Sequence, residues 1–208
     1  MPAYDEAIDH ALGMLHSFLS PHLTYHNVWH TEGDVMIAAD RLARMSNVST
    51  EDRRLLSVAA AFHDTGFIAC TVGHEDVGCE LAGSTLPRYG FSDAQIDQIQ
   101  HMVLATRVPQ QPQTLLEAIL ADADLDALGR PDLFARQRAL RQELAATGEG
   151  VVDDRTWLSS QLQFMRSHEF HTRAARTLRS AQKNYNTLML QRQLSYLSNS
   201  NGNGVYHS

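Results

Sequence analysis

The residues best suited to chemistry in this chain are histidines and aspartates that recur through its N-terminal part. They are His26, His30, His63, Asp64, His74, His101, Asp122 and Asp124. Imidazole nitrogens and carboxylate oxygens together suit Mn²⁺, Fe²⁺ or Zn²⁺, and suit Mg²⁺ less well. A lone histidine is more often a packed or surface group than a ligand, so the evidence lies in the order of these residues. That order predicts a site for one or two divalent ions, with Mn, Fe, Zn, Mg, Ni and Co as the candidates.

Amphipathic helices must position these side chains, because apolar residues recur three or four positions apart along nearly the whole chain. No alternating apolar run is long enough to predict a sheet, and no internal repeat is found. The expected fold is therefore all-α, a single-domain helical bundle. The predicted helices cover about 4–19, 28–45, 50–64, 74–87, 93–106, 113–128, 131–147, 153–168 and 170–193.

The helix that begins near Thr50 is the one that carries the His-Asp pair. Glu51 and Asp52 place negative charge at its N-terminal end, which favours a helix start. A broad apolar face then leads to His63-Asp64 at the C-terminal end, where Gly66 is expected to let the chain turn.

Composition points to one cytoplasmic globular domain. Of 208 residues, 43% are hydrophobic and 20% charged, and no apolar run is long enough for a membrane span. We expect the domain to cover 1–194 and the polar segment 195–208 to be a disordered tail. Cys70 and Cys79 are expected to be reduced, since a chain of this size does not depend on one disulfide.

Charge is distributed unevenly along the chain. Residues 1–129 contain 6 Lys and Arg against 18 Asp and Glu, a balance of −12, whereas residues 130–208 contain 11 against 6, or +5. An acidic segment repels nucleic-acid phosphates, so nucleic-acid binding is not expected. It is also the charge expected where carboxylates collect to bind cations.

The order of the histidines and aspartates resembles the HD superfamily of metal-dependent phosphohydrolases over about residues 20–130. His63-Asp64 resembles the doublet that names the family, and His30 resembles its first metal ligand. The resemblance implies an HD-type helical bundle in which His30, His63, Asp64 and one later aspartate hold a metal. Leu128-Gly129 favours Asp124 as that aspartate. Leu120-Ala121 favours Asp122 instead, and both stay candidates.

Members of that superfamily with two metals would use His74 and His101 for the second ion, with Asp64 as the bridge. The string Tyr25-His26-Asn27-x-x-His30 also resembles the signature of cyclic-nucleotide phosphodiesterases. In those enzymes the first histidine protonates the leaving oxygen, so the resemblance implies that role for His26.

The implied function is hydrolysis of a phosphate monoester or diester by metal-activated water, with catalytic roles for His26 and Asp64. Arg107 and Arg130 flank the helix of Asp122 and Asp124 and are the candidates for phosphate contact. We expect a small phosphorylated substrate, with nucleotides among the candidates, no membrane partner, and a homodimer left open. Two alternatives remain: a di-iron oxygenase that uses both His74 and His101, and a non-catalytic nucleotide sensor.

Overall fold

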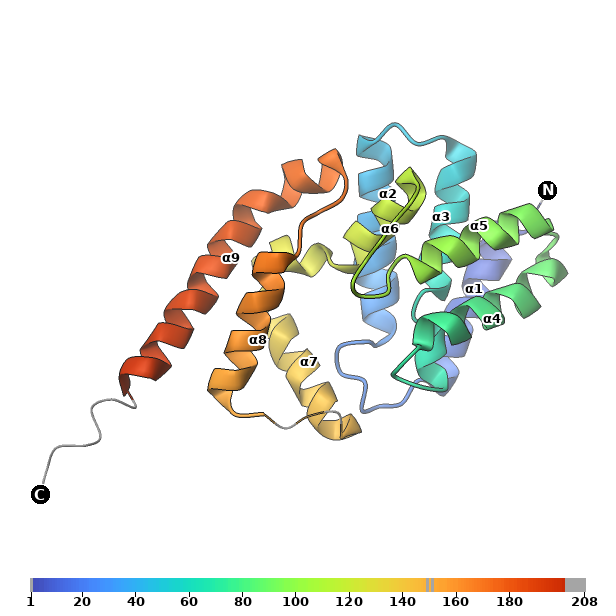
Figure 1. The fold of residues 1–208 in the computed structure, drawn as a ribbon. Helices are drawn as coiled ribbons and strands as arrows, with labels where there is room; N and C mark the ends of the chain where they lie inside the picture. Colours follow the sequence, from blue (N-terminus) through green and yellow to red (C-terminus); the bar gives the residue numbers. More distant parts are fainter. Residues whose placement is uncertain (1, 149, 151, 201–208) are drawn as a thin grey trace, which may run out of the picture.

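The structure, a computed structural model, describes residues 2–148, 150 and 152–200, and it is built from helices (Figure 1). No strand occurs among these residues, which confirms the all-α prediction. In chain order the elements are α1 (Tyr4–Phe18), the π-helical turn η1 (His30–Val35), α2 (Met36–Met45), α3 (Thr50–Phe62), η2 (Thr65–Ile68), α4 (His74–Thr85), η3 (Leu86–Tyr89), α5 (Asp93–Leu104), α6 (Leu115–Asp124), η4 (Asp126–Gly129), α7 (Leu133–Thr147), α8 (Asp154–Ser167) and α9 (Arg173–Ser200).

Helix α3 lies at the centre of the bundle and packs against α1, α2, α5 and α6. Its buried residues run almost without interruption from Leu55 to Phe62, so this helix faces protein on most sides. Helices α7, α8 and α9 stand on the other side of the molecule, where the long α9 packs along α8 and η4 (Figure 1). The metal-ligand candidates of the sequence thus come from the group around α3.

Short polar side chains begin several of these helices. Ser49, Ser92, Thr114 and Asp153 each accept a hydrogen bond from a backbone N–H in the first turn of the helix that follows. Such caps satisfy donors that the helix itself leaves unpaired. The start of α3 at Thr50 agrees with the sequence prediction.

The C-terminal helix extends farther than the sequence suggests. A tail was expected from residue 195, but α9 continues to Ser200. The hydroxyls of Ser195 and Ser198 donate to the carbonyls of Gln191 and Leu194, so these polar residues are accommodated within the helix. The rest of the expected tail, 201–208, lies outside the described residues.

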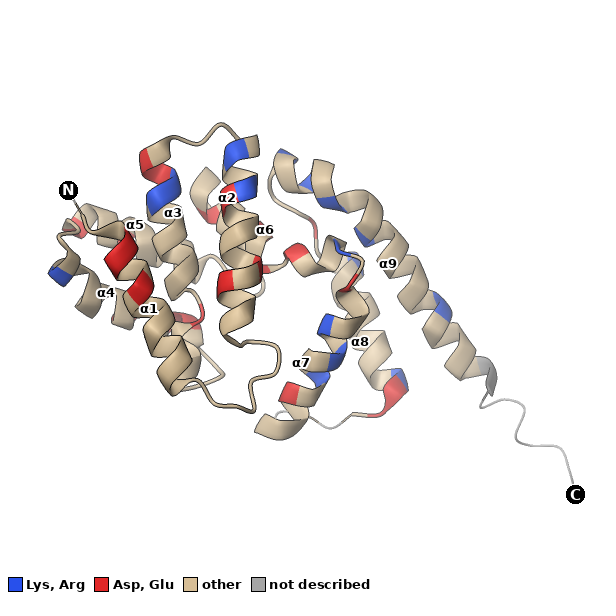
Figure 2. Ribbon diagram, turned by 180° about the vertical axis from the view of Figure 1, so that it is seen from behind, with Lys and Arg blue, Asp and Glu red and all other residues tan. Residues whose placement is uncertain are grey.

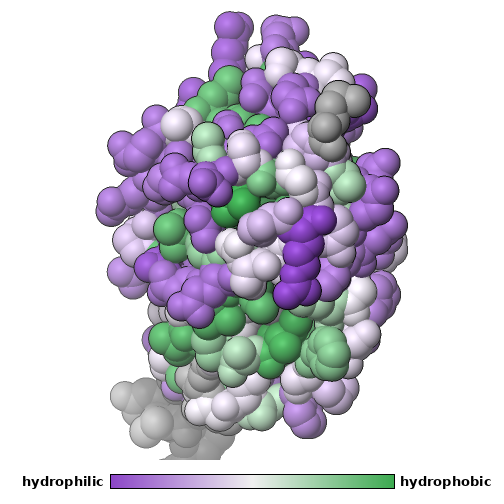
Figure 3. Space-filling model, turned by 90° about the vertical axis from the view of Figure 1, so that its right-hand side faces the viewer, coloured by the Kyte–Doolittle hydropathy of each residue, from purple (hydrophilic) through white to green (hydrophobic). Residues whose placement is uncertain are grey.

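The distribution of charge over the structure follows the sequence. Acidic residues are frequent on α1 to α6, and most residues marked basic lie on α7 and α9 or at the ends of α2 and α3 (Figure 2). On the side formed by α1, α4 and α5, apolar side chains are interspersed among hydrophilic ones (Figure 3). Within the described ranges, no helix combines the length and hydropathy that crossing a membrane requires.

Gly66 permits a close approach between η2 and the start of α4. A Cβ at this position would lie 1.8 Å from the carbonyl oxygen of His74. The chain turns at Gly66 as expected, within η2, and it does so without a positive φ. The missing side chain is what lets His74 lie beside the His63-Asp64 pair.

We predict that Gly66→Ala lowers the free energy of unfolding by about 1–3 kcal/mol or more, because the clash is with backbone that must move. Gly13→Ala is the matched control, since a Cβ there meets nothing within 4 Å and the residue lies inside α1. The control should be neutral or more stable by up to about 1 kcal/mol. Urea denaturation of both variants measures the difference, and equal stability of Gly66→Ala and the unmutated protein would refute the prediction.

Candidate metal centre

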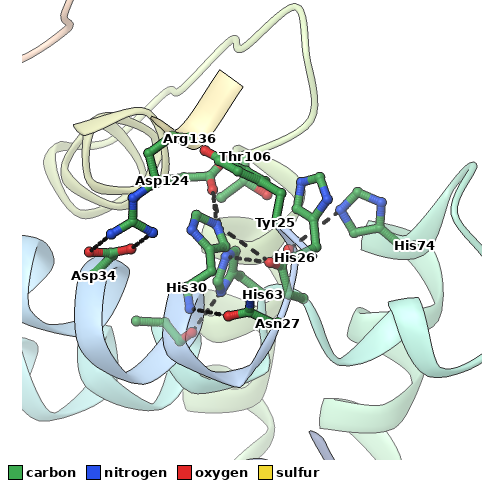
Figure 4. A network of polar contacts seen from close by, with 12 residues as sticks. Tyr25, His26, Asn27, His30, Asp34, His63, His74, Thr106, Asp124 and Arg136 are labelled. Carbon is green, nitrogen blue, oxygen red and sulfur yellow. Dashed lines mark hydrogen bonds and ion pairs between the residues drawn. The ribbon is translucent and has the colours of Figure 1, made fainter. Parts of the chain in front are cut away.

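Four side chains from three segments, the start of η1, the end of α3 and the end of α6, converge beneath a cavity in the group of helices around α3. Figure 4 labels three of them, His30, His63 and Asp124. His30 Nε2 lies 3.2 Å from Asp124 Oδ1 and 3.5 Å from Asp64 Oδ2. His63 Nε2 lies 3.2 Å from Asp64 Oδ2 and 3.6 Å from Asp124 Oδ1. The ligand atoms of His30, His63 and Asp124 are all within 4.8 Å of one another. These three residues are close enough together to hold one ion, and Asp64 lies beside both imidazoles.

Unpaired polar atoms at the centre of this cluster fit a metal. The Nδ1–H of His63 donates to the carbonyl of Ala60 at 2.7 Å, which leaves the lone pair on Nε2. His63 Nε2 and Asp64 Oδ2 are both buried, and neither has a hydrogen-bond partner in the part of the chain that the structure describes. Buried polar atoms without partners are rare and costly. Two nitrogens and two carboxylates are also a common ligand set for transition metals.

The charges of the cluster attract a cation. Burial raises the pKa of Asp64 and of Asp124, but the neighbouring imidazoles of His63 and His30 lower both pKa values well below the ordinary range. Burial in turn lowers the pKa of His63, and the two carboxylates raise it well above its ordinary value. The carboxylates therefore hold positive charge next to them, which can be a proton on imidazole or a metal ion in its place.

His74 approaches Asp64 from the opposite side. Its Nδ1–H donates to the carbonyl of Thr71 at 3.0 Å, and its Nε2 lies 3.7 Å from Asp64 Oδ1. The buried carboxylate of Glu75 lies 3.8 Å from the same nitrogen. Asp64 thus directs one oxygen to His30 and His63 and the other to His74. This is the placement expected of a carboxylate between two cation sites.

His101 is not brought to this cluster. It lies near the end of α5 with a side chain that is 59% exposed, and its Nδ1 is 3.5 Å from Asp97. It lines a different cavity from the one that contains Asp64 and His74. The ligand set that the di-iron oxygenase alternative requires is therefore not assembled in this structure.

The two candidate aspartates at the end of α6 have separate environments. Asp124 reaches His30 and His63, whereas Asp122 is buried on another side. Its two oxygens accept the backbone N–H groups of His171 and Thr172 at 2.7 and 2.8 Å. Residues two apart on a helix point about 200° apart, so one of the pair faces the cluster and the other faces α9. The geometry favours Asp124 as the ligand and gives Asp122 an anchoring role.

His26 lies at the edge of the cluster, held by a residue far along the chain. Its Nδ1 is hydrogen-bonded to Oε1 of Glu143, whose other oxygen accepts the backbone N–H groups of Tyr25 and His26 at 2.8 and 2.9 Å. Three donors to one carboxylate place the proton on Nδ1 and leave Nε2 as the ring's other functional atom. Burial lowers the pKa of His26, but the bond to Glu143 and the nearby carboxylates outweigh it and raise the pKa above its ordinary value.

A shared helix does not bring His26 close to His30. His26 precedes the helix, as the predicted start near residue 28 implies, and the side chain of Asn27 accepts the N–H of His30 at 3.1 Å. The two imidazole centroids are nonetheless only 5.7 Å apart. Contacts from outside the helix fix the ring, since Phe67 stacks on it at 4.3 Å and also stacks on His74 at 3.9 Å.

These groups border a cavity of about 560 Å³. Its wall includes Tyr25, His26, Asp64, His74, Glu75, Thr106, Arg107 and Asp124. Arg107 is half-exposed at the rim and pairs with Asp76 at 2.7 Å and Glu75 at 3.5 Å. Arg130 is not part of this wall: its guanidinium is paired with Asp34 at 2.6 Å and Asp132 at 2.8 Å. Only one of the two expected phosphate contacts thus borders the cavity.

Three residues beside the cluster could not be identified as site residues from the sequence analysis above: Glu143, Glu75 and Phe67. Glu75 follows His74 directly, so the spacing of acidic residues around the histidines could have indicated it. Phe67 follows the His-Asp pair by three residues but has an ordinary apolar side chain. Glu143 had no signal, since it lies 117 residues from His26 in α7.

Two comparisons with known proteins found matches. The sequence model of the HD domain matches residues 30–127. A crystal structure of a predicted HD superfamily hydrolase from an uncultured Thermotogales bacterium is similar, with a TM-score of 0.61, 21% identity and 94% of each chain covered. At that identity the likeness shows the fold. No curated protein matches the chain.

We predict that His63→Ala and Asp64→Ala each lose at least one tightly bound metal ion while the helical fold persists, because both side chains face the centre of the cluster. His101→Ala should keep the full metal content, since His101 lies outside it. Elemental analysis of the purified variants, with circular dichroism as the check on folding, makes the comparison. Full metal content in a folded Asp64→Ala protein would contradict the assignment, and loss of metal in His101→Ala would restore that residue to the ligand set.

Proposed function

Residues 30–127 form an HD domain, and from that premise we propose that this protein is a metal-dependent phosphohydrolase that cleaves a phosphate ester or phosphodiester of a small, nucleotide-like molecule. The observation that carries the proposal is the pair of buried, unpaired atoms, His63 Nε2 and Asp64 Oδ2, that face each other between His30 and Asp124. Asp64 and Asp124 also line a cavity large enough for a small substrate.

The ligand set is His30, His63, Asp64 and Asp124, and His74 with Glu75 are the candidates for a second ion. A divalent ion bound there would activate water for attack and neutralise charge on the phosphoryl oxygens. Asp64 has an oxygen on each side, so it can orient both sets of ligands. Arg107 at the rim is the nearest guanidinium for the substrate's phosphate, once it gives up part of its pairing with Asp76.

His26 is suited to protonate the leaving oxygen. Glu143 holds its Nδ1–H, so in the protonated ring the Nε2–H is the proton available for transfer. The raised pKa keeps this proton on the ring in a larger fraction of molecules at neutral pH. An alkoxide leaving group becomes strongly basic as the P–O bond breaks, and a proton donated at that moment lowers the barrier.

A screen of phosphate monoesters and diesters against protein loaded with Mn²⁺, Mg²⁺ or Fe²⁺ tests the function. Hydrolysis should require the metal and should disappear in Asp64→Ala. Elemental analysis of the native protein in the same experiment identifies the ion. Tight nucleotide binding by metal-loaded protein without hydrolysis of any ester would favour the non-catalytic sensor instead.

We predict that His26→Ala keeps its metal but hydrolyses an ester with an alkoxide leaving group about 10²–10⁴-fold more slowly. The loss should be much smaller for a nitrophenyl ester, whose phenolate needs little help from an acid. The activity that depends on protonated His26 falls as pH rises through its raised pKa, so the basic limb of the pH profile should vanish in the variant.

His22→Ala is the control, because His22 is an exposed histidine in the same segment. It should retain the rate, the metal and both limbs of the profile. An equal loss on both esters in His26→Ala would indicate that His26 positions the substrate, and loss of the metal would make it a ligand.

A further inference from the structure

A cavity of about 620 Å³ lies among α7, α8 and α9, the three C-terminal helices (Figure 1). Among the residues that the structure describes, its wall has none in common with the wall of the metal cavity. All of its wall residues follow residue 127, where the match to the HD domain ends. The cavity is therefore separate from the candidate metal centre, and membership of the family does not indicate what it binds.

Apolar side chains from all three helices form much of this wall. They are Phe134 of α7, Trp157 and Leu158 of α8, and Met189 of α9. Trp157 is buried, and Phe134 and Leu158 are half-buried and pack against the hydrophobic core. Because packing holds these side chains in position, their remaining apolar surface can cover the apolar part of a ligand.

Three guanidinium groups border the same cavity, against one carboxylate. Arg141 is paired with that carboxylate, Asp154, at 2.7 Å, and it lies over the ring of Trp157 at 5.7 Å from the centroid. Arg138 and Arg192 are exposed, and neither makes an ion pair or a side-chain hydrogen bond with another residue in the described part of the chain. Two positive charges of this wall thus stay without a partner.

The sequence places no acidic side chain where it would neutralise these two charges within their own helices. No aspartate or glutamate follows Glu169, so α9 contains none to pair with Arg192. Arg138 has no acidic residue three or four positions away in α7, the spacing at which helix side chains pair. Unpaired guanidinium groups from two helices beside an apolar wall attract an anion.

We propose that this cavity binds a small amphipathic carboxylate. Arg138 and Arg192 bind the carboxylate group, and the apolar body of the ligand lies against Trp157 and Leu158. A guanidinium can donate two parallel hydrogen bonds to a carboxylate. A neutral apolar ligand would leave the arginines unpaired, and a small hydrophilic anion would leave the apolar wall in water. The site does not depend on the proposed function, because it is separate from the metal cavity.

Octanoate is the probe, and compounds that represent its two halves are the controls. Isothermal titration calorimetry should detect octanoate binding with a dissociation constant in the millimolar range or below. Octanol and acetate should each bind at least about 10-fold more weakly, because each supplies only one of the two kinds of contact. Absence of octanoate binding would overturn the proposal. Octanol binding as tight as that of octanoate would overturn the role of the arginines.

Variants of exposed arginines test the location of the carboxylate. Arg138→Gln and Arg192→Gln should each weaken octanoate binding at least about 3-fold, and the double variant at least about 10-fold. Arg155→Gln is the matched control, since Arg155 is an exposed arginine of α8 outside this wall. It should change the affinity less than about 2-fold, because a screened charge at a distance contributes little. Equal losses in all three single variants would indicate non-specific attraction of the anion and overturn the site.

Tryptophan fluorescence provides a readout at the cavity itself. The chain contains two tryptophans: Trp157 in the wall and Trp29, which is 65% exposed and lies outside it. In a Trp29→Phe protein, octanoate should change the emission of Trp157 with the dissociation constant that calorimetry gives. If octanoate binds without changing that emission, and with unaltered affinity in the Arg138 and Arg192 variants, it occupies another site and the proposal is wrong.

Discussion

The buried carboxylates of Asp64 and Asp124 impose the strongest constraint on this fold. Removing a carboxylate from water costs several kcal/mol unless positive charge and hydrogen bonds compensate it. Here the compensation comes from His30 and His63, which face both carboxylates at 3.2–3.6 Å. Their Nε2 atoms can bear protons, or, in the metal-bound protein that we propose, bind the ion in place of those protons. The surrounding helices must therefore hold these polar side chains together inside an otherwise apolar core.

Residues of the C-terminal part, outside the matched domain, form ion pairs with acidic residues close to the cluster. Asp34, directly beside the cluster in η1, is paired with Arg130 and Arg136, which lead into and lie in α7. Asp126, two residues after Asp124, receives two hydrogen bonds of 2.7 Å from Arg179 of α9. Three of the arginines after residue 129, Arg130, Arg136 and Arg179, thus pair with acidic residues of the other part. This explains why Arg130, a candidate for phosphate contact, is already paired.

The sequence predicted the parts of the site that depend on local order. The helix that leads to His63-Asp64 and the all-α fold follow from local spacing. The candidate ligands follow from the order of histidines and aspartates along the chain and from the resemblance to the HD superfamily. The choice between Asp122 and Asp124 could not be made, because it depends on which face of α6 meets His171 and Thr172. His101 shows the same limit, since periodicity placed it in a helix but did not fix the direction of its side chain.

Contacts between distant segments could not be predicted from the sequence either, because they depend on how the helices pack. Glu143 in α7 is hydrogen-bonded to His26, and nothing in the sequence near either residue indicates that contact. Burial lowers the pKa of His168, and no local sequence pattern indicates that burial. Glu143 and His168 lie after residue 127, where the HD match ends. The matched segment supplies His30, His63 and Asp124, which could hold a cation. The later helices add Glu143, which orients His26, and part of the wall of a cavity that adjoins the metal cavity. Under the function proposed above, differences in substrate between proteins with such a centre should therefore be sought in α7, α8 and α9.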